Sequence, residues 1–200
     1  MQILVEELER PMAIHWERGM TDDEYFQFCA SNPDVRIERS AEGDILIMPP
    51  VGGESSFRNN ELSAELRIWA RKDGRGRAFD SSVQYYLPGG AAYSPDTSWV
   101  LRSRLSELTR EEQRKFLRLC PDFVVELMSP SDRLSKLKAK MREWIENGAQ
   151  LGWLLDPDRR TVYIYRPDCE PEQLVNPERL AGEGPVAGFV LVLADVWAEL

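Results

Sequence analysis

The sequence predicts an α+β fold with α/β-like character, in which a mixed β-sheet is flanked by helices. Short apolar runs typical of strands, such as DFVVELM and GWLLD, alternate with amphipathic segments of helical period. The chain has 200 residues, 42% of them hydrophobic, which is enough for one well-buried core. Its Pro/Gly clusters are too short to separate domains. We therefore expect a surface-packed extension at residues 1–19 and a single domain at residues 20–200.

Composition excludes several kinds of chemistry. The single histidine, His15, rules out zinc sites that need two or three histidines, and a Ser-His-Asp triad would have to include it. The chain carries 34 acidic and 25 basic residues, for a formal net charge of -9. That charge argues against binding nucleic acid or an anionic membrane through bulk electrostatics. Carboxylates, lysines and hydroxyls remain as the groups that can carry a reaction.

Cysteine content and hydropathy indicate a cytoplasmic protein. Cys29, Cys120 and Cys169 form no C-x-x-C pair, which suits a reducing compartment and argues against a zinc site. The N-terminus lacks the features of a signal peptide, and the longest apolar runs fall far short of the ~20 residues that span a bilayer. We expect no membrane association.

In the N-terminal half, short strands should alternate with two helices. Thr21 and Glu24 have the spacing of a capping box, which predicts a helix over residues 22–30. VRIERS and DILIMPP follow as two strands joined by a turn. A long helix comes next, because apolar residues recur at helical spacing until glycines end the pattern: Leu62, Leu66 and Trp69, then Gly74 and Gly76.

After the long helix, strands are expected at RAFDSS, VQYYLP and TSWVL, followed by a short helix in LTREEQRKFLRLC capped by Thr109. DFVVELM is the clearest buried strand. After SPSD, which offers Ser and Asp as a cap, comes an amphipathic helix with one apolar stripe: Leu134, Leu137, Met141, Trp144 and Ile145. GWLLD and VYIYR should form a hairpin, and GFVLVL a last strand.

Three carboxylates stand out as candidate functional residues. Glu126 interrupts the apolar run FVVELM, and burying it ionised would require a cation, a metal ion or a raised pKa. Its alternative interpretation is a strand with one face in solvent. Asp96 stands at the mouth of a strand, although Asp there is often only a turn residue. Glu38 alternates with Arg36 in VRIERS, which would also describe an ordinary exposed strand.

Lys140 supplies an opposite charge. At about 100° per residue it lies on the border of the helix's apolar stripe, where its ammonium could meet a carboxylate of the sheet. A solvated helix face is the alternative, which we prefer for Lys136 and Lys138. Carboxylates at strand ends together with a lysine form a hard oxygen site suited to Mg²⁺ or Mn²⁺, and such a site can hydrolyse phosphodiesters without histidine.

The chain resembles the Uma-two family of restriction-endonuclease-like proteins, within the PD-(D/E)XK nuclease superfamily. The resemblance runs from about Met20 to the C-terminus. Its most specific parts occur in order as PDFVVEL-SPSD, then K-M-x-x-W-x-x-x-G, then GWLLDP. It implies a restriction-endonuclease-like core, with a mixed sheet of four or five strands, helices on both sides and the site at one sheet edge.

The resemblance also implies roles for individual residues. Asp96 and Glu126 match the motif acids that bind the metal, and Glu38 matches a supporting ligand or water-orienting group. Met128 stands where the superfamily motif has lysine, and Lys140 on the following helix matches the displaced catalytic lysine. Lys136 stays open as the alternative. Two further residues, Glu54 and Gln84, could line the pocket or be an ordinary loop and strand.

The leading hypothesis is a Mg²⁺- or Mn²⁺-dependent endonuclease acting on DNA. Two basic stretches favour it despite the acidic total: Arg67, Arg71, Lys72, Arg75 and Arg77, and then Arg133, Lys136, Lys138, Lys140 and Arg142. One alternative is a nuclease-fold module that binds nucleic acid or protein without useful turnover. Another is a hydroxyl nucleophile, Ser129 or Ser131, activated by Lys136. A homodimer is open too, on the expectation that exposed Trp and Tyr side chains could form an interface.

Overall fold

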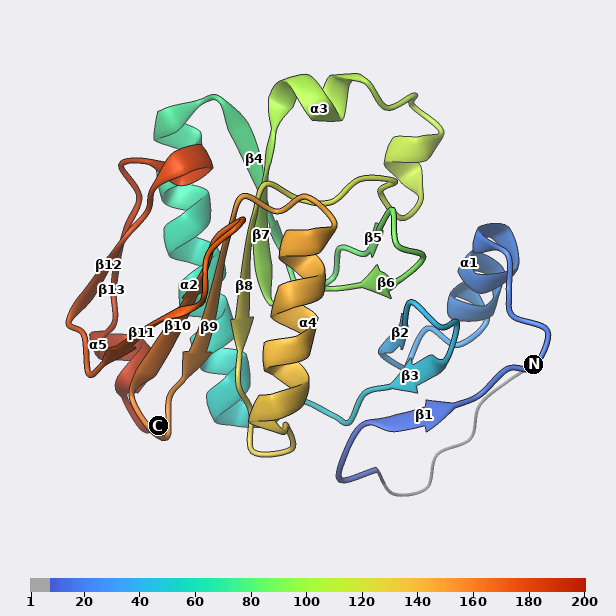
Figure 1. Ribbon diagram of the computed structural model, residues 1–200, viewed down its shortest axis with the longest axis horizontal. Helices are drawn as coiled ribbons and strands as arrows, with labels where there is room; N and C mark the ends of the chain where they lie inside the picture. The colour runs from blue at the N-terminus through green and yellow to red at the C-terminus, as the bar shows by residue number, and fades with distance from the viewer. Residues whose placement is uncertain (1–7) are drawn as a thin grey trace.

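A six-stranded mixed sheet forms the centre of the molecule in the computed structural model, which describes residues 8–200 (Figure 1). The strand order is β11-β10-β9-β8-β7-β4. Only β8 and β9 are parallel, with a helix between them, and the other neighbours are antiparallel. The strands are β4 (Gly76–Asp80), β7 (Thr97–Leu101), β8 (Phe123–Leu127), β9 (Leu151–Asp156), β10 (Thr161–Tyr165) and β11 (Glu172–Val175).

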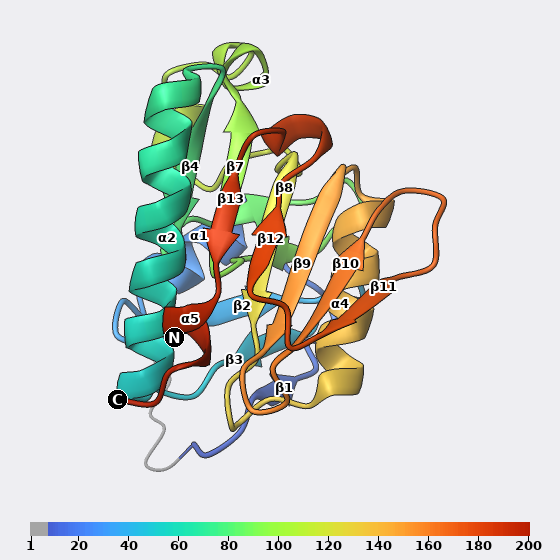
Figure 2. The ribbon, with the colours of Figure 1, turned by 90° about the vertical axis from the view of Figure 1, so that its left-hand side faces the viewer.

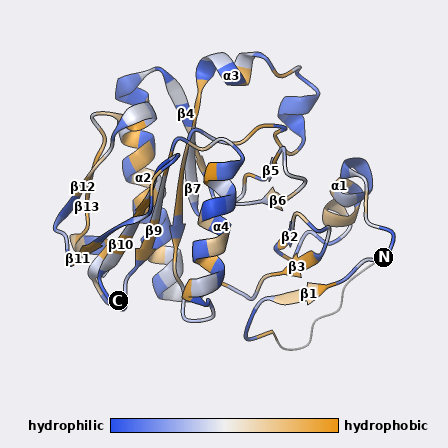
Figure 3. Ribbon diagram, viewed as in Figure 1, coloured by the Kyte–Doolittle hydropathy of each residue, from blue (hydrophilic) through white to orange (hydrophobic). Residues whose placement is uncertain are grey.

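Helices cover both faces of this sheet (Figure 2). On one face lie α2 (Gly53–Asp73), α5 (Ala194–Trp197) and a hairpin of β12 (Arg179–Ala181) and β13 (Val190–Val192). On the other lies α4 (Leu134–Glu146). In Figure 3 both long helices alternate between hydrophilic and hydrophobic colours, as expected for helices with one face on a sheet.

Strand β8 is buried on both faces. Phe123, Val125 and Leu127 pack on the α2 side, and Val124 packs on the α4 side. Glu126 therefore points toward α4 and is only 3% exposed. Its interpretation as a solvated residue on a half-exposed strand is wrong.

A second, five-stranded sheet of short strands packs with α1 (Asp22–Ala30) in the order β1-β3-β2-β6-β5. Its strands are β1 (Met12–Ile14), β2 (Ile37–Arg39), β3 (Ile45–Ile47), β5 (Tyr85–Tyr86) and β6 (Ala92–Tyr93). The expected 1–19 extension lies partly outside the described residues, and its residues 12–14 form β1, paired with β3. The division into an extension and one domain stays a prediction.

Several sequence expectations are confirmed. The mixed sheet flanked by helices is present, Thr21 and Glu24 form the capping box of α1, and Gly74 ends α2 with a left-handed backbone at φ 74°. GWLLD and VYIYR form the β9–β10 hairpin. Across residues 8–200, no helix is both long and apolar enough to cross a bilayer.

Other expectations need correction. The central sheet has six strands, more than the four or five expected. The segment around Thr109 forms only a 3₁₀ turn, η1 (Glu112–Arg114). Thr109 and Glu112 make the contacts of a helix cap, but no α-helix directly follows them. SPSD does not cap α4: Arg133 is its N-cap, without a side-chain hydrogen bond, and Ser129 bonds Asp132 instead.

Some short elements had no sequence signal. These are β6, β11, β12, the five-residue helix α3 (Arg102–Ser106), the 3₁₀ turn η2 (Gly184–Val186) and α5. The argument for a homodimer from exposed aromatic residues is also wrong. All six tryptophans and all six tyrosines lie within residues 8–200, and each is buried or half-buried.

Candidate functional site

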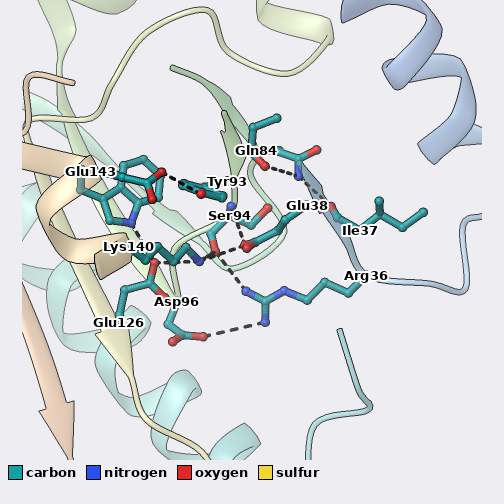
Figure 4. A network of polar contacts seen from close by, with 12 residues as sticks. Arg36, Ile37, Glu38, Gln84, Tyr93, Ser94, Asp96, Glu126, Lys140 and Glu143 are labelled. Carbon is teal, nitrogen blue, oxygen red and sulfur yellow. Dashed lines mark hydrogen bonds and ion pairs between the residues drawn. The ribbon is translucent and has the colours of Figure 1, made fainter. Parts of the chain in front are cut away.

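Three buried carboxylates from three elements meet beside one lysine. Glu38 comes from β2, Asp96 directly precedes β7, and Glu126 is in β8; they are 2%, 7% and 3% exposed. Lys140 reaches them from α4 (Figure 4). The structure thus brings all four sequence-predicted site residues into one neighbourhood.

Lys140 lies between two of the carboxylates. Its Nζ atom is 3.0 Å from Glu38 Oε1 and 3.0 Å from Glu126 Oε1. It also lies 3.4 Å from the backbone oxygen of Ser94 and 5.1 Å from the centroid of the Tyr93 ring. An ammonium group has three N–H donors, so these three oxygen contacts use all of them.

Helical spacing explains why Lys140 reaches the site. Met141 and Trp144 are fully buried against the sheet, and Lys140, one turn before Trp144, shares the Trp144 side of the helix. Trp144 Nε1 donates to Glu126 Oε1 at 2.9 Å. The same helix face therefore supplies an indole and an ammonium to a single carboxylate oxygen.

Asp96, directly before β7, lies opposite Glu126 on the neighbouring strand β8. Thr97 pairs with Val125 in the antiparallel β7–β8 ladder, so continuing the register places Asp96 opposite Glu126, on the same side of the sheet. Asp96 Oδ2 accepts the backbone N–H of Leu127 at 2.7 Å, and Oδ1 accepts Asn59 Nδ2 at 3.0 Å. Arg36 Nη1 lies 4.0 Å from Asp96 Oδ1.

Burial dominates the electrostatics of the carboxylate pair. It raises the pKa of Glu126 to about 7; Lys140 opposes this rise, while the charges of Asp96 and Glu38 add to it. Burial also raises the pKa of Asp96, against the opposing effect of Arg36. Burial alone would lower the pKa of Lys140, but Glu126 and Glu38 outweigh it and raise that pKa. The lysine is therefore a firmly held cation.

The oxygen donors beside the carboxylate pair fit a hard divalent cation. Two close carboxylates with raised pKa values are stabilised by an added positive charge. The amide oxygen of Asn59, next to Asp96, is buried and accepts no hydrogen bond from the described residues. Within residues 8–200, however, no three His, Cys, Asp or Glu side chains are grouped as a metal site.

Two comparisons bear on identity. A family model described as "Uma2: Putative restriction endonuclease" matches residues 22–194. The chain belongs to the Uma2 family. It is also similar to a solved structure described as "a putative nuclease belonging to DUF820 from Anabaena variabilis ATCC 29413", at 25% identity and a TM-score of 0.74. That match covers 89% of this chain and 97% of the other. None of the curated proteins matches. Family and fold together support a nuclease.

The remaining candidates of this Uma2 chain make their hydrogen bonds and ion pairs with groups other than the three carboxylates. Glu54 is exposed and pairs with Arg58 at 3.4 Å. Gln84 is buried and donates to the backbone oxygen of Ile37 at 2.8 Å, so it ties β2 in place. Lys136 is exposed, and Ser129 Oγ donates to Asp132 at 2.7 Å. Among residues 8–200, no hydrogen bond joins the Lys136 side chain to Ser129 or Ser131, so a serine nucleophile activated by Lys136 stays a prediction.

Sequence reasoning missed Arg36 and Asn59. Arg36 alternates with Glu38 in a way typical of exposed strands, and Asn59 is one of several polar residues in the first turns of α2. Only the pairing of β2 and α2 with the rest of the fold brings both side chains to Asp96.

Proposed function

We propose that this chain is a Mg²⁺- or Mn²⁺-dependent endonuclease that hydrolyses phosphodiester bonds of DNA. The observation that carries the proposal is the buried Asp96–Glu126 pair with Lys140 beside it, in a chain of this family. Buried ion pairs are a weak source of stability, because the cost of removing their charges from water often cancels their attraction. Buried carboxylates with shifted pKa values beside a cation are, in contrast, typical of functional sites, and this supports the proposal.

Asp96 and Glu126 would hold the metal ion. When bound, the ion would supply a water of lowered pKa and neutralise charge that develops on the phosphate. The chain's own groups fix the two carboxylates: Leu127 N–H and Asn59 orient Asp96, while Trp144 and Lys140 orient Glu126. Rigid support of this kind is what metal ligands require.

In this proposal Lys140 acts through its charge. Its raised pKa and its three contacts keep it protonated, so it serves as an electrostatic group and does not accept a proton. Glu38 accepts the N–H of Ser94 at 3.0 Å and contacts Lys140. We therefore assign Glu38 a supporting role, holding the lysine against Glu126.

For DNA contact we propose the basic stretch on α4. Arg133, the N-cap of the helix that carries Lys140, is exposed, as are Lys136 and Arg142 on that helix. Lys138 Nζ lies 3.9 Å from the centroid of the Tyr163 ring, in a cation–π contact. The other basic stretch ends α2. Asn59 and Lys72 are thirteen residues apart on that helix, about 20 Å at 1.5 Å per residue, so this stretch is remote from the carboxylates.

Nicking of supercoiled plasmid tests the proposal. Wild type should nick with Mg²⁺ or Mn²⁺ and stop in EDTA, and Glu126→Gln should lower the rate by about 10²-fold or more, as loss of a group in the reacting site does. Glu65→Gln is the matched control, because Glu65 is an exposed glutamate on α2. Folded wild type that never nicks would sink the proposal. Nicking that survives in Glu126→Gln would place the activity elsewhere.

A nuclease-fold module that binds DNA or protein without turnover is the second candidate. It is favoured by the absence, within residues 8–200, of a three-ligand metal group, and by the Lys140 ammonium placed against Glu126. For such a module, a duplex oligonucleotide should bind equally in EDTA and in Ca²⁺, and Glu126→Gln should leave that binding unchanged.

A cytoplasmic location and a homodimer complete the proposal. Cys29, Cys120 and Cys169 are free thiols, which suits a reducing compartment. Two copies would let both strands of a duplex be cut, and light scattering of the purified protein measures whether they assemble.

A further inference from the structure

The candidate site contains two cations, and they are held in different ways. Lys140 directs all three N–H donors at oxygens of the protein, and its side chain is 13% exposed. The side chain of Arg36 is 30% exposed, so it lies nearer the solvent side of the site. Figure 4 shows it extending from the β2 side toward Asp96.

Arg36 has unused hydrogen-bonding capacity. Its Nη2 donates to the backbone oxygen of Ser94 at 3.1 Å, but Nη1 is 4.0 Å from Asp96 Oδ1, beyond hydrogen-bond distance. Its Nε is buried and has no hydrogen-bond partner in the described part of the chain. A guanidinium has five N–H donors. The Nε donor is buried and one Nη2 donor is used, so the donors that a ligand could reach are those of Nη1 and the second one of Nη2.

The charge balance of the loaded site suits a phosphate ligand. With a divalent ion held by Asp96 and Glu126, the three carboxylates, Lys140, Arg36 and the ion together would carry a net charge of about +1, which favours a phosphodiester anion. A guanidinium binds two phosphate oxygens through parallel N–H donors, which a lysine already held by two carboxylates does not do. Of the two cations, Arg36 is the one with both exposure and spare donors.

Resting on the proposed nuclease function, we propose that Arg36 binds the phosphate of the scissile phosphodiester, and that Lys140 positions the carboxylates. In the hydrolysis a water oxygen bonds to phosphorus, the P–O bond to the leaving sugar oxygen breaks, and a proton of that water ends on the leaving oxygen. Arg36 would stabilise the negative charge that grows on the non-bridging oxygens.

Three variants test this role. Arg36→Gln removes the charge, Arg36→Lys keeps the charge and loses the planar fork, and Arg102→Gln removes an exposed arginine at the opposite end of β7 as the matched control. Three measurements are made on each: kcat/KM for nicking in Mn²⁺, the salt dependence of duplex oligonucleotide binding in Ca²⁺, and Mn²⁺ affinity by calorimetry.

We expect Arg36→Gln to lower kcat/KM by about 10²-fold, the usual loss when a charge-stabilising donor is removed. The binding constant for duplex oligonucleotide decreases with salt concentration, and the slope of its logarithm against log[salt] should become less steep by about 0.9 in Arg36→Gln. This is the value of one phosphate contact. Arg36→Lys should keep the salt slope and lose much of kcat/KM. Arg102→Gln should keep kcat/KM, and Mn²⁺ should bind all variants.

The outcomes separate this proposal from the nuclease itself. If wild type nicks DNA and Arg36→Gln keeps both kcat/KM and salt slope, Arg36 has no phosphate role and the nuclease stands. If Arg36→Gln and Arg36→Lys lose Mn²⁺ binding in step with activity while the salt slope holds, Arg36 acts only through Asp96 and the proposal fails. If wild type never nicks but Arg36→Gln still lowers the slope, the phosphate contact stands without the nuclease.

Discussion

At the scale of single residues, the site depends on how one carboxylate is kept in the interior. Glu126 sits in a fully buried strand, where an unpaired carboxylate would cost several kcal/mol. The Trp144 indole and the Lys140 ammonium both contact its Oε1 atom. Because Glu38 holds the same ammonium from the other side, Lys140 is shared and compensates Glu126 only in part. The part of the burial cost of the charged carboxylate that Lys140 does not compensate raises the pKa of Glu126.

That raised pKa predicts a pH dependence of stability. Without metal, folded Glu126 binds its proton up to about pH 7, whereas the ordinary value is 4.5. Its contribution is therefore fully present below pH 4.5 and is lost as pH rises toward 7. We expect wild type to lose stability relative to Glu126→Gln between pH 5 and 8. Urea unfolding of both proteins in EDTA measures the difference, and a difference that stays flat over this range would contradict the assignment.

At the scale of elements, the sequence predicted those whose pattern is local. The buried strand β8 and the amphipathic helix α4 follow from hydrophobic period alone, and Glu126 was visible as a break in that pattern. The border position of Lys140 followed from helical geometry. Arg36 and Asn59 could not be found this way, because their importance arises from strand and helix pairings across the fold. Two-residue strands such as β6 exist only through their neighbours.

The seating of α4 on the sheet depends on a glycine in β9. A Cβ added at Gly152 would lie 2.4 Å from Met141 Cε and 3.3 Å from Val124 Cγ2. Gly152→Ala should therefore overpack this contact and cost about 1–3 kcal/mol. Met141→Ala alone should cost about 2–5 kcal/mol by leaving a cavity. In the double variant the alanine methyl fills part of that cavity.

The double-mutant cycle gives the test. The Gly152→Ala/Met141→Ala protein should be more stable than the sum of the two single changes implies, by a coupling of about 0.5–3 kcal/mol in urea unfolding. If the stability changes of the two single variants simply add in the double variant, Gly152 does not determine how closely Met141 packs on β9. If α4 moves to relieve this contact, nicking by Gly152→Ala should also fall, because Lys140 precedes Met141 on that helix.

At the scale of the whole molecule, the site lies where the two sheets meet. The six-stranded sheet contributes Asp96 and Glu126, and the five-stranded sheet contributes Glu38 and, just before β2, Arg36. Gln84 bonds the backbone of Ile37 and so holds β2 at this junction. The formal charge of -9 thus averages a buried acidic cluster, an acidic surface and two basic helix stretches. The negative net charge attracts cations to the molecule as a whole, whereas DNA would be attracted only to the two basic stretches.

Cation binding should therefore couple to folding of the whole chain. A ligand that binds only the folded state adds RT ln(1 + [L]/Kd), about 2.7 kcal/mol at a hundredfold excess over Kd. At a Mn²⁺ concentration a hundred times its Kd, we expect the free energy of unfolding to rise by about this amount, and EDTA to reverse the rise. The Asp96→Asn/Glu126→Gln protein should gain nothing from Mn²⁺, whereas Glu65→Gln should respond as wild type does. An equal gain in all three proteins would mean that the cation binds the acidic surface, because only a site built from Asp96 and Glu126 makes the double variant silent.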